Sequence, residues 1–481
     1  MDEIKGHIRA WAEIDELGGE DALTRAERRL IGDAVAGKTC RLGEHLPPEI
    51  LGRDVPDPAV HIRAPILRYL LLGGCANCPT AGKTFEVEGA HITGTLNLDY
   101  QELQNPLRVF RSRFNSRLDT TQTCVAMINL SQCQLSGWRA QRLDCEGSVF
   151  IRRVKSSAGI DLRGAIIGGQ VSFSKLQLDI SDRHELIDRT DALNARGLRV
   201  SREIIWSDVM ASQGSISFVG ARCEAIWDQP TSWPGEGRTR LDGLIYDRII
   251  NSTTDAKARL EWIAKGETPG RFFPQPYTHL AKVLREMGHE RDARDVLIAK
   301  ERRHNTHTRN FTKRTLDGSV TMGLRSIWLD LKRPLDALLR WVAGYGYAPV
   351  RSGWTILIFI VLTYFPSTFA YNAGDFAPNS GVIQVSDGWS NLANDATVAN
   401  PADTWANTQP GRDWETFDPI IYAADVVIPI INFGQTEAWA PSTTRGPWGW
   451  HLWWFKSLMA LAGWIVTAIG AAAITGIIRR D

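Results

Sequence analysis

The chain has 481 residues, enough for two or three domains, and its formal net charge of +1 excludes a global field that would attract nucleic acid or an acidic substrate. The N-terminus is charged and amphipathic and lacks an apolar core segment, so no signal peptide is expected. Seven scattered cysteines, the last of them Cys223, form no tight framework, and their odd number favours a reducing compartment.

Residues 1–83 are predicted to form an N-terminal helical cap, because residues 3–35 carry apolar side chains at helical spacing. Residues 77–84 resemble a phosphate-binding loop, but Asn77 stands where that motif needs glycine. Cys75 and Cys78 form a CxxC pair without the second pair or histidine of a zinc site. Neither motif therefore predicts a nucleotide, metal or redox site.

Residues 84–228 alternate apolar and polar side chains, which is the period of a β-strand, and they contain a loose internal repeat. The segment from Gly89 to Leu98 aligns with the segment from Gly164 to Phe173, and weaker copies start at Leu135, Val200 and Ala221. Short strands at a near-regular period predict a solenoid. An ordinary β-sandwich is the alternative.

The same stretch resembles a right-handed β-helix of the pentapeptide-repeat type. The resemblance implies that Leu, Ile, Val and Phe stack inward from coil to coil. Outward side chains are expected to be solvated, among them Arg152, Arg153, Lys175 and Arg199. A solenoid has no built-in catalytic site but offers a long rigid surface, so the expected use is as a scaffold or a partner-binding surface.

Residues 229–303 are predicted to contain a linker and a helical hairpin that breaks at Gly288 and resembles a single tetratricopeptide hairpin. Residues 304–351 form a basic amphipathic connector, because the stretch from Arg302 to Arg351 has ten Lys or Arg and three Asp or Glu. Such a helix is expected on the inner membrane surface. A helix that packs on the solenoid is the alternative.

Two uncharged runs, residues 352–374 and 457–478, are long enough to span a bilayer as helices, although Pro366 is expected to kink or end the first. A buried pair of core helices is the alternative. Arg351 precedes the first run, Arg479 and Arg480 follow the second, and the intervening residues 375–456 are an acidic loop. Positive flanks face the cytoplasm, so both termini are predicted to be cytoplasmic. By resemblance, the membrane is a bacterial inner membrane.

Within the acidic loop, residues 417–431 are predicted to form a short half-helix, with Asp418 as its cap and Pro419 in its first turn. Pro429 interrupts it, so it is too short to span a membrane and is interpreted as re-entrant or interfacial.

The order of span, half-helix, glycine loop and span resembles the two-helix pore module of potassium-type channels. The Tyr-Gly-Tyr-Ala-Pro run at 345–349 is similar to the sequence before the first span of channels that carry pentapeptide repeats. The resemblance implies a pore loop whose backbone carbonyls coordinate an ion. Its candidate residues are Asp425, Asn432, Phe433, Gly434 and Gln435. The family's threonines are replaced by Ile430 and Ile431, so selectivity for potassium is not inferred. The alternative is a half-helix that only packs against the hairpin.

The predicted fold is a multi-domain α+β membrane protein: a right-handed β-solenoid with flanking helices, then a two-span hairpin with a re-entrant half-helix. The first functional hypothesis is a membrane-anchored cytoplasmic interaction or sensing module with a protein partner on the solenoid. The second is an oligomeric ion-channel-like pore lined by residues 417–435. Similar chains are sometimes labelled membrane-associated oxidoreductases, but no cofactor motif supports an enzyme. The expected partners are membrane lipids, further copies of the chain and ions, without nucleic acid or cofactor.

Overall fold

The computed structural model describes residues 22–43, 57–75, 78–180, 191–235, 237–267, 271–316 and 322–477, and between 309 and 332 it describes the backbone alone. The chain divides into two compact units, Met1–Thr308 and Arg309–Asp481, which are treated separately below. Most of the helix predicted over 3–35 lies outside the described residues, and only its last part is seen, as α1 (Arg25–Val35).

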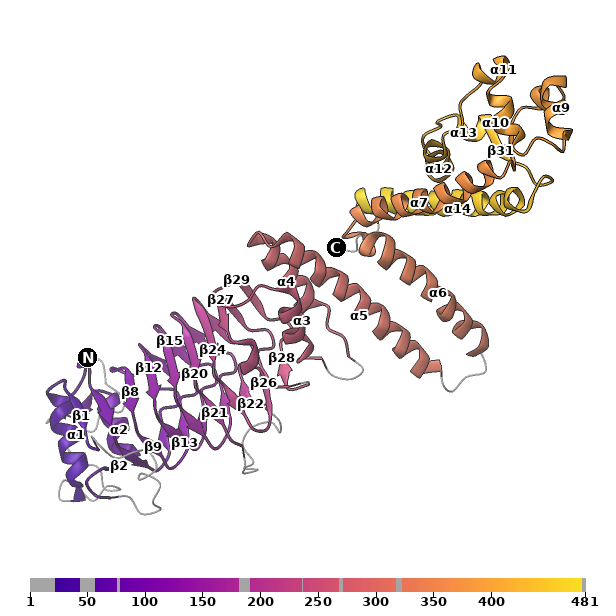
Figure 1. Ribbon diagram of the computed structural model, residues 1–481. Coiled ribbons are helices and arrows are strands. Elements are labelled where there is room, and N and C mark those ends of the chain that lie inside the picture. The colour runs from indigo at the N-terminus through magenta and orange to yellow at the C-terminus, as the bar shows by residue number, and fades with distance from the viewer. Residues whose placement is uncertain are drawn as a thin grey trace. The chain divides into compact units, whose positions relative to one another are not determined.

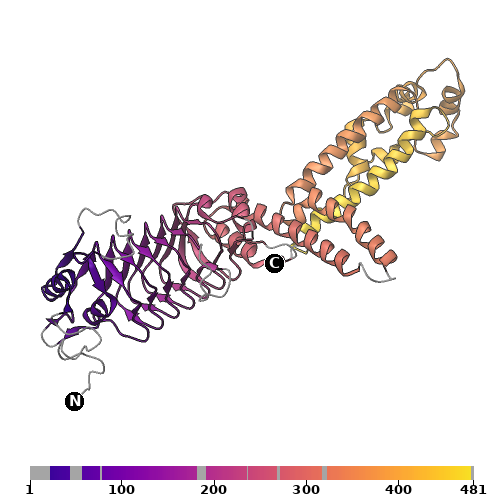
Figure 2. The same cartoon turned by 90° about the horizontal axis from the view of Figure 1, so that it is seen from below.

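The first unit is a β-solenoid of about seven turns, which Figures 1 and 2 show as a stack of short parallel arrows. Each turn passes through four ladders of parallel strands, so every strand pairs with the equivalent strands of the coils before and after it. A β-sandwich would instead pair its strands antiparallel. The solenoid prediction is therefore confirmed and the sandwich alternative is wrong.

The four ladders are as follows. Ladder 1 contains β1 (Thr39–Arg41), β5 (Glu86–Glu88), β8 (Leu107–Phe110), β12 (Ile128–Ser131), β16 (Val149–Arg152), β20 (Val171–Ser174), β24 (Glu203–Ser207) and β27 (Arg222–Asp228). Ladder 2 contains β2 (His61–Arg63), β6 (His91–Thr93), β9 (Arg113–Phe114), β13 (Gln134–Leu135), β17 (Lys155–Ser156), β21 (Gln177–Leu178) and β25 (Met210–Ala211). Ladder 3 contains β7 (Leu96–Asn97), β10 (Leu118–Asp119), β14 (Trp138–Arg139), β18 (Ile160–Asp161), β22 (Asp191–Asn194), β26 (Ser215–Ser217) and β28 (Thr239–Arg240). Ladder 4 contains β11 (Cys124–Val125), β15 (Asp144–Cys145), β19 (Ile166–Ile167), β23 (Arg199–Val200), the first part of β27, and β29 (Ile245–Ile249).

The core consists of apolar side chains stacked from coil to coil. Leu107, Ile128, Val149 and Val171 pair in register and are fully buried, so each of these coils takes 21 or 22 residues. Side chains alternate along each strand because successive Cβ atoms point to opposite faces. The expected outward residues are exposed, namely Arg152, Arg153, Lys175 and Arg199.

The structure corrects the alignment of the internal repeat. Residues 89–98 contain β6 and β7, which belong to ladders 2 and 3. Residues 164–173 contain β19 and β20, which belong to ladders 4 and 1. The aligned segments therefore lie on different faces of the solenoid. All faces bury an apolar residue in a similar short pattern, so a pairwise alignment does not distinguish one face from another.

Two corners of each coil hold a residue with left-handed backbone. The corner between ladders 1 and 2 holds Arg111, Gln132, Arg153, Lys175 and Asp208, with φ between 45° and 58°. The corner between ladders 3 and 4 holds Tyr100, Gln122 and Arg142, then Gly164, Gly197, Gly220 and Gly243. This conformation costs a non-glycine residue about 1–2 kcal/mol, whereas glycine adopts it freely.

Helices close the first end of the solenoid. Thr24 and Glu27 form a capping box at the start of α1, and Glu27 also accepts hydrogen bonds from Arg63. α2 (Ala64–Leu71) follows β2, and β3 (Gly74–Cys75) pairs with β4 (Cys78–Pro79). Because β1 and β2 already pair with β5 and β6, the ladders begin before residue 84.

At the other end, β28 and β29 extend the ladders past residue 228, and η5 (Pro230–Ser232), α3 (Ala256–Ala264), α4 (Gln275–Glu286) and α5 (Glu290–Leu316) follow or flank them. Trp206 stacks on Trp233 with ring centroids 4.8 Å apart. Arg259 donates to both carboxylate oxygens of Asp228 at 2.8 and 3.0 Å, and neither side chain is exposed. The helix pair α4 and α5 confirms the predicted hairpin, and Gly288 breaks it with φ +85°.

The second unit has two long helices, α7 (Val350–Asn372) and α14 (Pro447–Ile474), which lie side by side (Figure 2). α6 (Met322–Ala343) and η6 (Gly344–Gly346) precede them. Between the long helices come β30 (Phe376–Pro378), α8 (Gly381–Gln384), α9 (Asp387–Asn394), α10 (Pro401–Ala406), α11 (Gln409–Arg412), α12 (Pro419–Val427), α13 (Gln435–Ala438) and β31 (Trp439–Pro441).

By length and composition, α7 and α14 are the two described helices that could span a membrane, with mean hydropathies of 1.6 and 1.9. Pro366 does not end α7, which continues to Asn372. α14 begins at Pro447, ten residues before the predicted start at residue 457. The prediction treated the charged residue Lys456 as the boundary of the apolar run, whereas Lys456 lies inside the helix. The predicted half-helix is present as α12, which ends before Pro429.

Candidate functional site

The predicted half-helix α12 packs against both long helices and reaches from one end of the pair to its middle. At its start, Phe417 stacks on Tyr371, near the end of α7, with centroids 4.2 Å apart. At its other end, the carbonyl of Val427 lies so close to Gly463 that a Cβ atom there would stand 2.0 Å away. Gly463 lies near the middle of α14, so α12 descends about half of that helix.

The segment after α12 returns along it to the same end of the helix pair. Gln435 is buried, accepts a hydrogen bond from the Asp418 backbone at 3.0 Å and donates to the Thr416 carbonyl at 2.8 Å. Asp418 itself caps α12 through the backbone N–H groups of Ile420 and Ile421, as predicted. Residues 428–434 thus form an irregular segment between the middle of the hairpin and its end.

Asp425 holds this segment. One of its carboxylate oxygens accepts from the Phe433 backbone at 2.8 Å, and the other accepts from the backbone and hydroxyl of Thr436 at 2.7 and 2.8 Å. Asn432 accepts from the Gly434 backbone and donates to Glu437, both at 2.7 Å. The structure therefore brings together all five residues of the predicted pore loop, but it gives Asp425 a positioning role.

Residues 430–433 of this segment are exposed in a single copy of the chain. Ile430 and Ile431 are 76% and 49% exposed, and Phe433 is 42% exposed. Within the described residues, the carbonyl oxygens of Ile430, Ile431 and Asn432 accept no hydrogen bond. Their lone pairs are free for water, an ion or another copy of the chain.

The long helices place small and polar side chains inside and large apolar side chains outside. The buried residues of α7 are Ser352, Thr355, Thr363, Ser367 and Ala370. Its exposed residues include Trp354, Leu357, Val361, Phe365 and Phe369. In the most apolar stretch of α7, 22% is buried, and in that of α14, 28% is buried. A core helix of a soluble protein would show the opposite arrangement.

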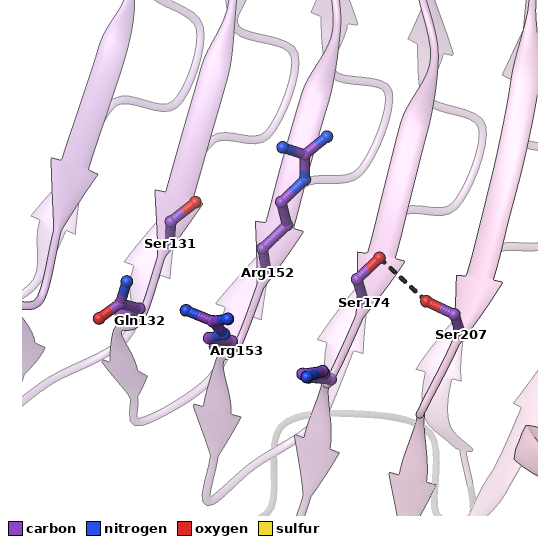
Figure 3. Close-up of a pocket in the computed structure, with 7 residues that line it drawn as sticks. Ser131, Gln132, Arg152, Arg153, Ser174 and Ser207 are labelled. Atoms are coloured by element: carbon purple, nitrogen blue, oxygen red, sulfur yellow. Dashed lines mark hydrogen bonds between the residues drawn. The ribbon is translucent and has the colours of Figure 1, made fainter.

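A second candidate site lies on the solenoid, at the corner between ladders 1 and 2. A groove of about 270 Å³ is lined there by Ser131, Gln132, Arg152, Arg153, Ser174, Lys175 and Ser207 (Figure 3). The sequence identified Arg152, Arg153 and Lys175 only as solvated residues. Their recurrence at the 21- or 22-residue period was the signal that they lie on neighbouring coils.

A third candidate site is a cavity of about 410 Å³ between ladder 3 and the helices α3 and α4. Its polar groups are largely paired with one another: Tyr277 donates to Glu267, and Arg303 donates to Glu267 and to Tyr277 at 2.5 and 2.8 Å. Burial, with the neighbouring Glu267 carboxylate, raises the pKa of Tyr277. These bonds join the segment after α3 to α4 and α5, which is a structural role.

The remaining sequence motifs form no reaction centre. Lys83, from the near phosphate-binding loop, donates to the Val35 carbonyl at 2.5 Å and so holds the end of α1, whereas Asn77 lies outside the described residues. Cys75 and Cys78 form a disulfide within the β3–β4 hairpin. Burial raises the pKa of Cys133 to about 12, which keeps that thiol protonated at neutral pH. The described part of the chain contains no group of three His, Cys, Asp or Glu placed to hold a metal.

No protein-family model, curated protein or solved structure matches this chain.

Proposed function

We propose that α7 and α14 cross a membrane and that, in a homo-oligomer, residues 428–434 line a path for ions. The observation that carries this proposal is an irregular segment that starts next to Val427, at half the depth of the helix pair, and whose residues 430–433 are exposed; among the described residues the carbonyl oxygens of 430–432 accept no hydrogen bond. Hydrocarbon offers no partner for free carbonyl oxygens, and non-helical backbone at membrane depth is tolerated only within protein or beside water.

Two helices cannot enclose a channel, so the path requires several copies of the chain. The carbonyl oxygens of Ile430, Ile431 and Asn432 are the groups that would face the ion or its water. Asp425 and the left-handed Gly434, with φ +81°, hold the segment in place. The proposed orientation puts both termini in the cytoplasm and residues 375–416 outside, in a bacterial inner membrane, because the basic residues Arg333 and Arg340 precede α7 and Arg351 lies in its first turn.

Cysteine accessibility tests the proposal without requiring the pore to be open. All native cysteines lie in the first unit, so single cysteines can be placed at Ile431 and, as a control, at Leu461 on the exposed apolar surface of α14. In a Cys124→Ser background, which removes the exposed native thiol, we expect a charged thiol reagent to modify Ile431→Cys in liposomes and to spare Leu461→Cys. Protection of both positions, or a monomer in mild detergent, would contradict the proposal.

Ion flux from the same liposomes tests conduction. Proline cannot adopt the positive φ of Gly434, so Gly434→Pro should abolish or alter the flux. Gly381→Pro is the matched control, because Gly381 is the first residue of α8, where proline is tolerated. Equal flux through both variants would exclude residues 428–434 from the path.

A second function, a membrane-anchored interaction or sensing module, is favoured by the open basic groove on the solenoid. The same membrane hairpin would then serve to localise a cytoplasmic binding surface. Among the described residues, no acidic side chain forms an ion pair with the exposed cations of that groove.

A further inference from the structure

We propose that the basic groove at the corner between ladders 1 and 2 binds a small anion that carries phosphate groups, such as a polyphosphate or the triphosphate of a nucleotide. Figure 3 shows the side chains of Arg152 and Arg153 projecting from adjacent positions of one coil, beside the serines of neighbouring coils. This inference is independent of the proposed pore.

The lining of the groove contains three cations and no carboxylate. Arg152 lies over the Phe150 ring, 4.3 Å from its centroid, which leaves its N–H groups free to bind at the ring edge or in solvent. Within the described residues, no acidic side chain lies within 4.0 Å of the charged groups of Arg152, Arg153 or Lys175. The lining therefore carries three cations without an ion-pair partner, and the nearest acidic residue in the corner row is Asp208, one coil beyond Lys175.

Earlier coils of the solenoid pair their cations with carboxylates. Arg108 pairs with Glu86 at 3.1 Å, and Arg111 pairs with Glu88. Arg111 occupies the same corner position as Arg153 and Lys175, as the backbone bonds from coil to coil show. A carboxylate partner is thus available to this corner position two coils before Arg153, whereas the one acidic residue of the corner row itself, Asp208, lies one coil beyond Lys175 and forms no ion pair within 4.0 Å among the described residues.

Two costs accompany this arrangement. Arg153 and Lys175 stand on successive coils, about 4.8 Å apart at the backbone, and like charges on adjacent strands repel. Both also have left-handed backbone, with φ +54° and +53°, which costs each about 1–2 kcal/mol. The left-handed backbone is shared by the corner residues of the neighbouring coils, so the repulsion between the two charges is the cost specific to the groove. A bound anion would neutralise the repulsion between Arg153 and Lys175 and would contact both side chains, whose spacing the solenoid fixes.

The chemistry of the groove fits phosphate. Arginine binds phosphate oxygens with paired N–H groups, and lysine binds them as a point charge. Hydroxyls of Ser131, Ser174 and Ser207 border the cations, and that of Ser131 donates to Asn129 at 2.7 Å. Ser207 donates to Ser174 at 3.2 Å, so these two hydroxyls are already held together. Two cations one coil apart suit a compact anion with at least two negative charges.

Titration calorimetry on the full-length protein in detergent, at 0.15 M ionic strength, tests the proposal with inorganic triphosphate, ATP and orthophosphate. The test variant is Arg153→Gln/Lys175→Gln. Glutamine is compatible with this corner, because Gln132 occupies it one coil earlier with φ +58°. We expect triphosphate or ATP to bind the wild type at submillimolar concentration and to bind the variant at least tenfold more weakly.

The matched control is Arg142→Gln/Arg199→Gln, which removes the same charge from two exposed arginines elsewhere on the solenoid. Gln122 precedes Arg142 at its own corner, so this variant is also compatible with the fold. Affinity should stay within about twofold of the wild type. No binding by the wild type, or equal losses in both variants, would overturn the proposal.

Two further arms identify the source of the phosphate. In one arm, a short-chain phosphatidylglycerol competes with triphosphate. If it competes more effectively than orthophosphate and its binding is weakened in the test variant, the result supports the proposed site and assigns it a lipid headgroup. Binding of a single-stranded RNA oligomer more tightly than triphosphate, with the same sensitivity, would overturn the small-anion proposal in favour of a nucleic-acid surface.

Discussion

The solenoid and the helix pair α7–α14 bury opposite kinds of side chain. In the solenoid, large apolar residues such as Phe173 and Trp206 are inside, and charged residues lie on the surface. In the helix pair, α7 turns its serines and threonines inward and exposes Trp354, Phe365 and other large apolar residues. The solenoid shows the burial pattern of a protein in water, and the exposed apolar side chains of the helix pair are compatible with the membrane that we propose.

The two regions also satisfy their backbone differently. Each solenoid strand bonds to the coils on both sides, so its peptide groups depend on residues about one coil away in sequence. The helices of the second unit satisfy their peptide groups locally, β30 and β31 pair with each other, and in the segment 428–434 the described carbonyl oxygens of residues 430–432 accept no hydrogen bond. A departure from the pattern of its own region is what makes this segment a functional candidate. Four predictions test the contrast between the regions, from the largest expected effect to the smallest.

The buried ion pair at the end of the solenoid should give the largest effect. Asp228→Ala leaves Arg259 charged and buried without a partner, which should lower the free energy of unfolding of the first unit by about 3–5 kcal/mol. Chemical denaturation of the full-length protein in detergent, followed by tryptophan fluorescence, measures it. Arg248→Ala is the control, because its pair with Glu224 is exposed and should contribute at most about 1 kcal/mol. Similar effects of the two changes would contradict the burial of the first pair.

The contact between α12 and α14 should give the next largest effect. A methyl group at Gly463 would overlap the Val427 carbonyl, so Gly463→Ala should destabilise the second unit by about 1–3 kcal/mol. Gly353→Ala in α7 has free space around it and should be neutral or stabilising, since alanine favours helix. Unfolding in mixed micelles compares the stabilities of the two variants. If alanine at residue 463 does not lower the stability, α12 does not pack against the middle of α14.

The glycine corner of the solenoid should give a smaller effect. Gly197 has φ +68°, and no heavy atom lies within 4 Å of the place that a Cβ atom would take. Gly197→Ala should therefore cost only the left-handed conformation, about 1–2 kcal/mol of the free energy of unfolding. Gly235→Ala is the control, since it also has free space and no positive φ. Equal unfolding midpoints for the two variants would argue against the left-handed corner.

Buried histidines should make the stability of the solenoid depend weakly on pH. Burial, with the nearby Arg113, lowers the pKa of His91, and burial also lowers the pKa of His61. The unfolded chain therefore binds protons first, and stability should fall as pH decreases through about 6.5 toward the lowered folded values. His91→Leu should flatten the dependence between pH 7 and pH 5 in denaturation experiments. An unchanged slope would show that His91 does not contribute.

Local sequence patterns were sufficient to predict which kind of secondary-structure element each region forms. Alternating side chains predicted the strands, Gly288 predicted the break between α4 and α5, and Asp418 with Pro419 predicted the start of α12. The order of spans and half-helix also placed Asn432 to Gln435 in one loop. These features depend on neighbours in sequence, through periodicity, capping and proline geometry, and so they can be read without the fold.

The sequence by itself thus determined a strand-rich region, a pair of long apolar helices and the loop between them. Only the tertiary structure decided which face of the solenoid each strand joins, that Asp425 holds residues 433–436, and that Arg153 and Lys175 become neighbours. Residues one coil apart meet only after the chain has closed a full turn, and the length of that turn varies with each corner. The sites of this protein are therefore made by long-range register, which local patterns do not specify.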